Sequence, residues 1–488
     1  DLKRLTEWSA GLGAGMMLIN PLGPPAPVVP QGASPYYPTT RRFRNPLYLR
    51  IEDVPGAEWL GPQLAQLAAE ARSLNALPRL DRDQVFHLKQ QALRAIWGQG
   101  TAIWGEGTGD GEFTAFRREQ GVSLERFSTF CALAEDFGPD WRKWPEECRR
   151  ADSAAVARFA AEHSGEVGYH AWLQWLLDRQ LSEASRAIPI LQDLPVGMDP
   201  GGADAWEWQD LLAKEMVIGA PPDAFNAIGQ DWQLPPFVPA KLRAAAYEPF
   251  IQTIRATLRH AGGLRIDHVM GLFRLWWIPN GQHPQQGWYV RYPADDLLGI
   301  VALESHRAGA FVVGEDLGNV EPGVRERLAL RGMLSYRLLW FEPRPPAEYP
   351  ELSMASVTTH DLPTIAGLWS GADEAAQRSI GLAVGNEMRQ LRDHLRELVG
   401  LESDAPVAEV IERAYRRLAQ APSRIITATL EDAQAMVDRP NMPGTTVQWP
   451  NWSLVLPQDI ETMVEAELPR RIAAALGRGK QGQSKKRP

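Results

Sequence analysis

The sequence predicts an α/β fold built on a parallel β-sheet. Short apolar runs alternate along the chain with longer helical patterns, which is the order of the βα units that form such a sheet. Each apolar run enters a turn rich in proline, glycine or acidic residues, as strands buried on both faces do. A chain of 488 residues is also long enough for one large barrel with a single core. We predict seven core strands at Gly15–Pro21, Ile188–Leu194, Gly263–His268, Ala310–Glu315, Tyr336–Phe341, Ala355–His360 and Arg424–Leu430.

A long insertion separates the first two predicted strands. Roughly 165 residues lie between them, which is far more than a βα crossover needs. Leu60–Trp97 and Ser153–Arg179 carry apolar residues three and four positions apart, the spacing of one helix face. The pattern therefore predicts a mostly helical subdomain at about 55–165. We expect a further loop insertion at about 196–250.

Composition and charge argue against several classes of function. The net charge of -9 disfavours nucleic acid as a partner, because a phosphate backbone attracts a basic surface. The uncharged stretch 8–40 is too rich in glycine and proline to span a membrane, and Glu7 interrupts any export signal. Cys131 and Cys148 are expected to be free thiols of a cytoplasmic protein. The last twelve residues, 477–488, are basic and lack an apolar anchor, which predicts a disordered tail at 476–488 rather than a nucleic-acid patch.

The third predicted strand carries a candidate nucleophile. Because side chains along a strand alternate between its faces, Arg265 and Asp267 lie on one face and Ile266 on the other. A guanidinium group beside a carboxylate favours the charged carboxylate and lowers its pKa, which suits a nucleophile at neutral pH. Taken alone, the pair is also compatible with a structural ion pair.

Two further acids follow predicted strands. Glu315 comes after a buried run, where desolvation raises the pKa of a carboxyl group and lets it hold a proton for donation. Asp361 follows a β-branched run and precedes Pro363. Each motif has a structural alternative, because Asp316 and Asp361 are also suited to cap the helices that follow them.

The three acids are more informative as a set. Parallel strands direct their carboxyl ends to one face, where barrel enzymes place their active sites. Two carboxylates suffice there to cleave a glycosidic bond with retention, and a third can stabilise positive charge on the sugar ring. A catalytic metal is the competing chemistry, with His268 or His360 as a ligand. The sequence contains no HExxH motif, cysteine pair or aspartate-rich calcium loop, so we expect no metal.

Aromatic residues are a second sign of a carbohydrate ligand. The chain has 18 tryptophans, and sugars stack their apolar faces on such rings. Most tryptophans nevertheless anchor cores, and of the adjacent Trp276 and Trp277 at least one is expected to be buried. Gln230 and Trp232 precede two prolines, and we predict that they stand on a mobile loop that covers a bound sugar.

Several motifs follow one another in a fixed order along nearly the whole chain. They are Ile19-Asn20-Pro21-Leu22-Gly23, Ser34-Pro35-Tyr36, Gly202-Ala203-Asp204-Ala205-Trp206, Arg265-Ile266-Asp267-His268, Gly314-Glu315-Asp316-Leu317-Gly318, Thr359-His360-Asp361, Arg439-Pro440-Asn441-Met442-Pro443 and Pro450-Asn451-Trp452. This ordered set resembles the amylomaltases, which are 4-α-glucanotransferases or disproportionating enzymes. The resemblance is greatest to the bacterial subgroup that carries an extra domain before the barrel.

The resemblance implies a fold, an activity and roles for residues. The fold is a (β/α)8 barrel of the TIM type with helical and loop insertions, and it forms a catalytic domain at 1–475. The activity is transfer of α-1,4-glucan segments from maltodextrin donors to maltodextrin or glucose acceptors, without a cofactor. Asp267 is the implied nucleophile, Glu315 the general acid/base and Asp361 the transition-state stabiliser. The implied substrate-binding residues are Ser34, Tyr36, Asp193, Gln230, Trp232, Arg265, His360 and Asn441.

The chain departs from the family pattern at two places. Val269-Met270 replaces the common Phe-Arg after His268, a variant that also resembles the subgroup with the extra domain. The first barrel strand of the family lies upstream of residue 1. We therefore expect residues 1–488 to be a fragment of a protein that carries this strand and a further domain before it.

Two alternative functions remain open at this point. An α-glucan hydrolase or a branching enzyme on a related barrel would use the same three acids. A non-catalytic glucan-binding protein would have no chemical need for three convergent carboxylates.

Overall fold

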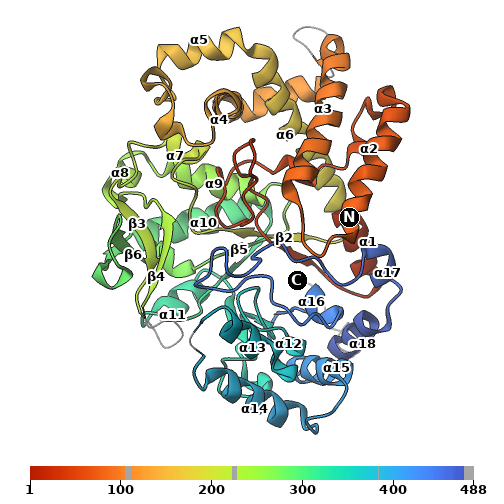
Figure 1. Cartoon of the computed structure of the whole chain (residues 1–488). Coiled ribbons are helices and arrows are strands. Elements are labelled where there is room, and N and C mark those ends of the chain that lie inside the picture. Colours follow the sequence, from red (N-terminus) through yellow and green to blue (C-terminus); the bar gives the residue numbers. More distant parts are fainter. Residues whose placement is uncertain (105–110, 223–227, 383, 478–488) are drawn as a thin grey trace. The chain divides into compact units, whose positions relative to one another are not determined.

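A computed structural model describes residues 1–104, 111–222, 228–382 and 384–477 of the chain. The chain forms two compact units (Figure 1). Most of the basic tail predicted at 476–488 lies outside the described residues. No helix in the described part is both long and apolar enough to cross a lipid bilayer. Unit 1 comprises Asp1–Met17, Ala187–Pro189 and Phe311–Pro488, and unit 2 comprises Leu18–Arg186 and Ile190–Ala310.

All seven predicted core strands are present, each shorter than predicted. In unit 2, β2 and β5 pair in parallel, and Asp193 stands opposite Arg265 in their register. In unit 1, β9, β10 and β11 form a parallel sheet with β10 in the centre. A parallel bridge between Val313 and Leu334 continues this pairing toward β8. The seven strands are β1 (Met17–Ile19), β2 (Ile190–Leu194), β5 (Gly263–Ile266), β8 (Phe311–Gly314), β9 (Ser335–Leu338), β10 (Ser353–Ser356) and β11 (Ile425–Ile426).

Strand β10 ends four residues before its predicted end at His360. The prediction was wrong here because two hydroxyl side chains bond to nearby backbone and compete with the β-ladder. Ser356 Oγ donates to the carbonyl of Thr358 at 2.7 Å, and Thr358 Oγ1 donates to the carbonyl of Pro363 at 2.9 Å. The segment that carries His360 is therefore a turn fixed by side chains.

The helices of unit 2 share a large aromatic core. Residues 167–177 of α6 are buried without interruption, as expected for a helix that is apolar on all sides. Trp172 of this run lies in one hydrophobic cluster with Trp144 and Trp206. Helix α4 is kinked at Gly121, whose φ of 55° and ψ of -140° suit a residue without a side chain. The helices are α2 (Pro62–Ser73), α3 (Arg82–Trp104), α4 (Gly111–Phe137), α5 (Ala154–Glu162), α6 (Ser164–Ala184), α7 (Ala203–Glu207), α8 (Pro239–Ala244), α9 (Glu248–Leu258) and α10 (Ala294–Ala308).

Unit 2 also contains an antiparallel sheet that was not predicted. Its order is β4-β3-β6-β7, formed by β3 (Met216–Ala220), β4 (Gln230–Leu234), β6 (Arg274–Pro279) and β7 (Trp288–Arg291). The stretch with Gln230 and Trp232 is thus an edge strand, and the prediction of a loop was wrong. The prolines that suggested a loop follow the strand, where they remove no ladder hydrogen bond. Trp277 of β6 is buried and Trp276 is half-buried, as predicted for this pair.

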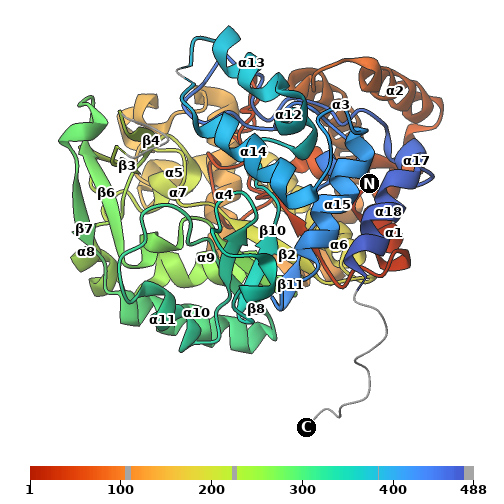
Figure 2. The ribbon, with the colours of Figure 1, turned by 90° about the horizontal axis from the view of Figure 1, so that it is seen from below.

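Several helices of unit 1 pack against its parallel sheet. A hydrophobic cluster joins Ala355 of β10 to Ile365, Leu395 and Tyr415. These three residues belong to α12, α14 and α15, which Figure 2 labels. Helix α12 begins at the cap residue Thr364, whose Oγ1 accepts a hydrogen bond from the amide of Gly367. The helices are α1 (Leu2–Gly11), α11 (Val324–Ala329), α12 (Ile365–Ser370), α13 (Ala372–Ser379), α14 (Glu387–Val399), α15 (Val407–Leu418), α16 (Leu430–Ala433), α17 (Ile460–Met463) and α18 (Glu467–Leu476).

Candidate active site

The carboxyl ends of β2 and β5 bring three charged side chains together in unit 2. Register places Asp193 beside Arg265, and alternation along β5 places Asp267 on the same face as Arg265. Arg265 Nη1 lies 2.7 Å and 2.6 Å from the two carboxylate oxygens of Asp193 and 3.0 Å from Asp267 Oδ1. Asp193 and Arg265 are buried. The guanidinium group therefore has a buried structural partner in Asp193 and also holds Asp267, a contact that is compatible with both predicted interpretations of the pair.

Tyr36 and Ser34 join this cluster from a loop near the start of unit 2. Tyr36 Oη donates to Asp193 Oδ2 at 2.6 Å, and Ser34 Oγ accepts from the amide of Tyr36 at 3.2 Å. Burial and the negative charge of Asp193 raise the pKa of the Tyr36 phenol well above its ordinary value. Tyr36 therefore stays protonated and remains a hydrogen-bond donor at neutral pH.

Strand β4 contributes Gln230 and Trp232 to the same region of unit 2. Trp232 Nε1 donates to Gln230 Oε1 at 3.0 Å. The indole ring meets the imidazole ring of His268 edge to face, with 5.3 Å between the ring centroids. Because His268 directly follows Asp267, this contact links the edge strand to the end of β5. His268 was considered from the sequence only as a metal ligand, and its packing against Trp232 needed the tertiary structure.

His268 is expected to make stability depend on pH. Desolvation and the nearby charge of Arg274 lower the pKa of its imidazole to about 4. Below about pH 6.5, His268 is protonated in the unfolded chain but stays neutral in the folded protein until about pH 4. The free energy of unfolding therefore decreases as pH falls across this window. For this half-buried ring the loss is at most about 3 kcal/mol.

Thermal unfolding of His268→Asn from pH 7 to pH 4 checks this expectation. Asparagine tolerates the left-handed backbone of this position, where φ is 45°. The melting temperature of the variant should fall less over this range than that of the wild type. His87→Asn, which changes an exposed histidine, is the matched control. Its melting temperature should fall as much as that of the wild type. Equal decreases in melting temperature from pH 7 to pH 4 for His268→Asn and the wild type would contradict the expectation.

Glu315 lies at the end of β8 in unit 1 and is nearly buried. Its Oε1 accepts a hydrogen bond from the amide of Leu317 at 2.7 Å. The neighbouring Asp316 is fully buried, accepts from the amide of Tyr336 at 2.6 Å and binds Arg325 Nε at 2.6 Å. Asp316 thus ties the end of β8 to β9. Helix α11 begins only at Val324, so the alternative in which Asp316 caps a helix was wrong.

Asp361 lies in the turn after β10 together with His360 and Asn441. Asn441 Nδ2 donates to Asp361 Oδ1 at 2.7 Å, and the backbone N–H of Asn441 donates to the carbonyl of His360 at 3.1 Å. His360 Nε2 is 3.5 Å from Asp361 Oδ2. The cap of the following helix is Thr364, so the alternative capping role of Asp361 was also wrong. Trp452 was missed as a neighbour of this turn, although its ring centroid is 5.0 Å from that of His360.

Arg439 contacts this turn from a distant part of the chain, and the sequence motif that contains it assigned it no role. Its side chain is buried and forms a two-point ion pair with the carboxylate of Asp373, with Nε at 2.7 Å from Oδ1. Its Nη1 donates to the main-chain carbonyl of Asp361 at 2.8 Å. Asp373 lies far from the motif in sequence, so only the fold shows that this arginine holds the backbone of Asp361.

The predicted site residues therefore fall into one group in each unit. Unit 1 contains Glu315 with the turn of His360, Asp361 and Asn441, and the parallel direction of β8, β9 and β10 puts both acids at the same edge. No group of three or more His, Cys, Asp or Glu residues in the described ranges is placed to hold a metal ion. Unit 2 contains Ser34, Tyr36, Asp193, Gln230, Trp232, Arg265 and Asp267.

Comparison with known proteins gives consistent matches over nearly the whole chain. A family model described as 4-alpha-glucanotransferase (Glyco_hydro_77) matches residues 1–459. A 4-alpha-glucanotransferase of Mycobacterium tuberculosis is 43% identical over 524 residues, which cover 98% of this chain and 71% of that protein. The 4-alpha-glucanotransferase of Haemophilus influenzae is 32% identical over 529 residues, with coverage of 98% and 75%.

Comparison with solved structures also finds similar folds. The amylomaltase from Corynebacterium glutamicum has a TM-score of 0.85 at 36% identity, over 98% of this chain and 72% of that chain. The amylomaltase from Streptococcus agalactiae, solved in complex with acarbose, has a TM-score of 0.78 at 18% identity, with coverage of 98% and 94%. These matches confirm the predicted fold class, an α/β fold of the TIM-barrel type.

Proposed function

Because the chain belongs to the 4-alpha-glucanotransferase family of enzymes, we propose that it transfers α-1,4-glucan segments between maltodextrins through a covalent glycosyl–aspartate intermediate. The observation that carries this mechanism is the contact between Arg265 and Asp267. A guanidinium nitrogen 3.0 Å from Asp267 Oδ1 favours the ionised carboxylate, the form that can attack an anomeric carbon.

The first displacement would break the glycosidic bond of the donor. Glu315 gives a proton to the departing glycosidic oxygen while a carboxylate oxygen of Asp267 bonds to the anomeric carbon. The products of this step are a released glucan end and a β-linked glycosyl ester on Asp267. The position of Glu315 at the carboxyl end of β8 supports this role, because barrel enzymes place their catalytic residues at this end of the strands.

The second displacement would transfer the glycosyl group to an acceptor. Glu315, now ionised, takes the proton from the 4-hydroxyl group of a maltodextrin or glucose, and that oxygen displaces Asp267 from the anomeric carbon. Two inversions restore the α-configuration. Asp361 is proposed to stabilise the positive charge that develops on the sugar ring in both steps. Its hydrogen bond from Asn441 holds one carboxylate oxygen in place.

Residues around Asp267 are proposed to bind the sugars. Tyr36, Asp193 and Arg265 form a continuous hydrogen-bonded chain that ends at Asp267, which keeps polar groups in place for sugar hydroxyls. Trp232 is half-buried on its strand and offers an indole on which a sugar ring can stack. Ser34, Gln230 and His360 are proposed as further polar contacts.

Chromatography of maltotriose products with parallel measurement of reducing ends tests the proposal. A ladder of glucose and longer maltodextrins at a constant number of reducing ends is expected. A rise in reducing ends would instead support the α-glucan hydrolase, and new branch points would support the branching enzyme. The family match does not support the non-catalytic binding protein considered from the sequence.

Replacing Arg439 with lysine is expected to lower kcat for maltotriose transfer by about tenfold to a hundredfold. Lysine keeps the positive charge but lacks the several nitrogens with which Arg439 donates to Asp373 and to the carbonyl of Asp361 at the same time. The backbone of Asp361 is therefore expected to shift. Initial rates over a range of maltotriose concentrations measure the effect, with KM expected to change less than kcat.

Arg392→Lys is the matched control for this variant. Arg392 also donates to a carboxylate, that of Glu374, and to a main-chain carbonyl, that of Leu368. Among the described residues it makes no hydrogen bond to the turn of Asp361. Its melting temperature should fall by a similar amount while kcat stays near the wild-type value. Equal losses of kcat in both variants would show that Arg439 acts only on stability.

A further inference from the structure

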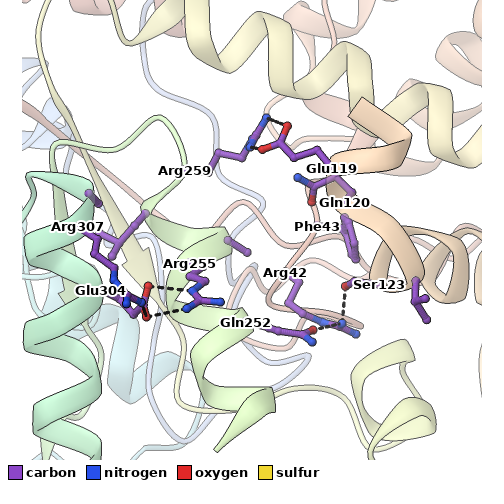
Figure 3. A pocket seen from close by; sticks show the side chains of 14 residues that line it. Arg42, Phe43, Glu119, Gln120, Ser123, Gln252, Arg255, Arg259, Glu304 and Arg307 are labelled. Carbon is purple, nitrogen blue, oxygen red and sulfur yellow. Dashed lines mark hydrogen bonds and ion pairs between the residues drawn. The ribbon is translucent and has the colours of Figure 1, made fainter. Parts of the chain in front are cut away.

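Unit 2 contains an open pocket of about 620 Å³ that includes none of the predicted glucan-binding residues (Figure 3). One wall is helix α4 at its kink near Gly121, and the facing wall is formed by α9 and the last turns of α10. Its volume is in the range of sites for small molecules of about 300–1,000 Å³. The residues that surround it are largely charged or polar, so its chemistry differs from that of an apolar cleft.

Two arginines on the facing wall share one buried carboxylate. Arg255 Nε and Nη2 donate to Glu304 at 2.9 Å and 3.0 Å, and Arg307 Nη1 donates to the same carboxylate at 2.8 Å. Glu304 is only 5% exposed, whereas the side chains of Arg255 and Arg307 are 54% and 56% exposed. Glu304 thus orients two solvent-facing guanidinium groups and neutralises only one of them.

These guanidinium groups keep donors for a ligand. Among the described residues, Arg255 Nη1 and the Nε and Nη2 atoms of Arg307 make no hydrogen bond to protein. The hydrogen bond from Arg255 lowers the pKa of Glu304, so its carboxylate stays ionised and continues to hold both arginines.

The other two arginines of the pocket are balanced by acids. Arg259 binds Glu119 and Asp178, and Arg42 binds Asp204 and Glu207. Arg42 also connects the two walls, because its Nη1 donates to Ser123 Oγ of α4 at 2.6 Å and to Gln252 Oε1 of α9 at 2.9 Å. Arg255 and Arg307 differ from these two arginines, because together they carry one positive charge more than their shared partner Glu304.

The chemistry of the pocket favours an anion over a glucan. Phe43 is the one aromatic residue among the described residues that line it, and its ring is 4% exposed, so no surface is offered for stacking a sugar. Guanidinium groups present paired N–H donors in a plane, which match the oxygens of a phosphate group. We propose that this pocket binds a small molecule that bears phosphate, of sugar-phosphate or nucleotide size, with Arg255 and Arg307 as its phosphate ligands.

Titration calorimetry of the full chain with inorganic pyrophosphate tests this site, with ADP and fructose 1,6-bisphosphate as larger phosphate probes. Maltotriose is first incubated with the protein until its products reach equilibrium, and this saturating mixture is present throughout, so that binding in the glucan site does not contribute. One pyrophosphate per chain is expected to bind, and binding should weaken as salt is raised. Arg255→Gln and Arg307→Gln are each expected to weaken binding by roughly tenfold or more. Tighter binding of ADP or of the bisphosphate than of pyrophosphate would identify the rest of the ligand.

Arg186→Gln is the matched control, because Arg186 is also an exposed arginine paired with a glutamate three residues earlier, Glu183. It should bind pyrophosphate as the wild type does. Transfer from maltotriose should be unchanged in all three variants, which shows that they are folded and separates this test from that of the proposed function. Absence of binding to the wild type, or equal binding by all variants, would overturn the proposal.

Discussion

Asp267→Asn is expected to lower the rate of maltotriose disproportionation by about 10⁴-fold or more. An amide has almost the same shape as the carboxylate but cannot form the glycosyl ester, so the two-step route is lost. Arg265 retains its buried partner Asp193 in the variant, so the strand end should keep its structure. Product chromatography over long incubations, together with a melting curve, measures both the loss and the integrity of the fold.

Two further measurements make this prediction specific to a nucleophile. Asp210→Asn changes an exposed aspartate that is also paired with an arginine, Arg150, and should leave the rate near that of the wild type. Mass spectrometry of the wild type after reaction with 5-fluoro-α-glucosyl fluoride should find a glycosyl adduct on the peptide that contains Asp267. An Asp267→Asn variant within tenfold of the wild-type rate, or an adduct on another residue, would exclude Asp267 as the nucleophile.

Glu315→Gln is expected to lower transfer from maltotriose by about 10³-fold and to slow the first release of fluoride from α-maltosyl fluoride much less. Departure of the glycosidic oxygen needs a proton, which glutamine cannot supply, whereas fluoride leaves without one. The variant should therefore accumulate the glycosyl–enzyme when it is given the fluoride. Release of fluoride in an initial burst, followed by slow turnover, is the expected signal.

A structural role for Glu315 would give a different pattern. The uncharged glutamine oxygen would accept the hydrogen bond from the amide of Leu317 more weakly, which would disturb the end of β8 and slow fluoride release as much as transfer from maltotriose. Glu351→Gln, in which an exposed glutamate is changed, controls for the substitution itself and should be active on both. A burst of fluoride release that is slowed as much as transfer from maltotriose would contradict the assignment of Glu315 as the acid.

The strands and the acids that follow them were predictable because their signals are local. A buried parallel strand is a short apolar run, and its end is marked by the turn residues that follow, so β5 and Asp267 could be located from a few neighbouring residues. The same holds for Glu315 after β8. Strand ends were less accurate, since the hydroxyl groups of Ser356 and Thr358 decide where β10 stops.

The antiparallel sheet was not predictable because its signals are distributed over distant segments. Strand β4 exists through its pairing with β3, in which Ala220 lies opposite Gln230. Gly219 allows this approach, since a Cβ atom there would lie 2.0 Å from the carbonyl oxygen of Gln230. Nothing near Trp232 in the sequence indicates this partner, and the two prolines that follow suggest a loop.

The sequence by itself determined the α/β fold class, the positions of the core strands and the identity of the three candidate acids. Each of these depends on residues that are adjacent in the chain. Tertiary structure alone decided what holds those acids, because Asp193 reaches Arg265 through strand register and Arg439 reaches Asp361 through a buried pair with Asp373. Such contacts join residues far apart in sequence, and their geometry exists only once the chain has folded.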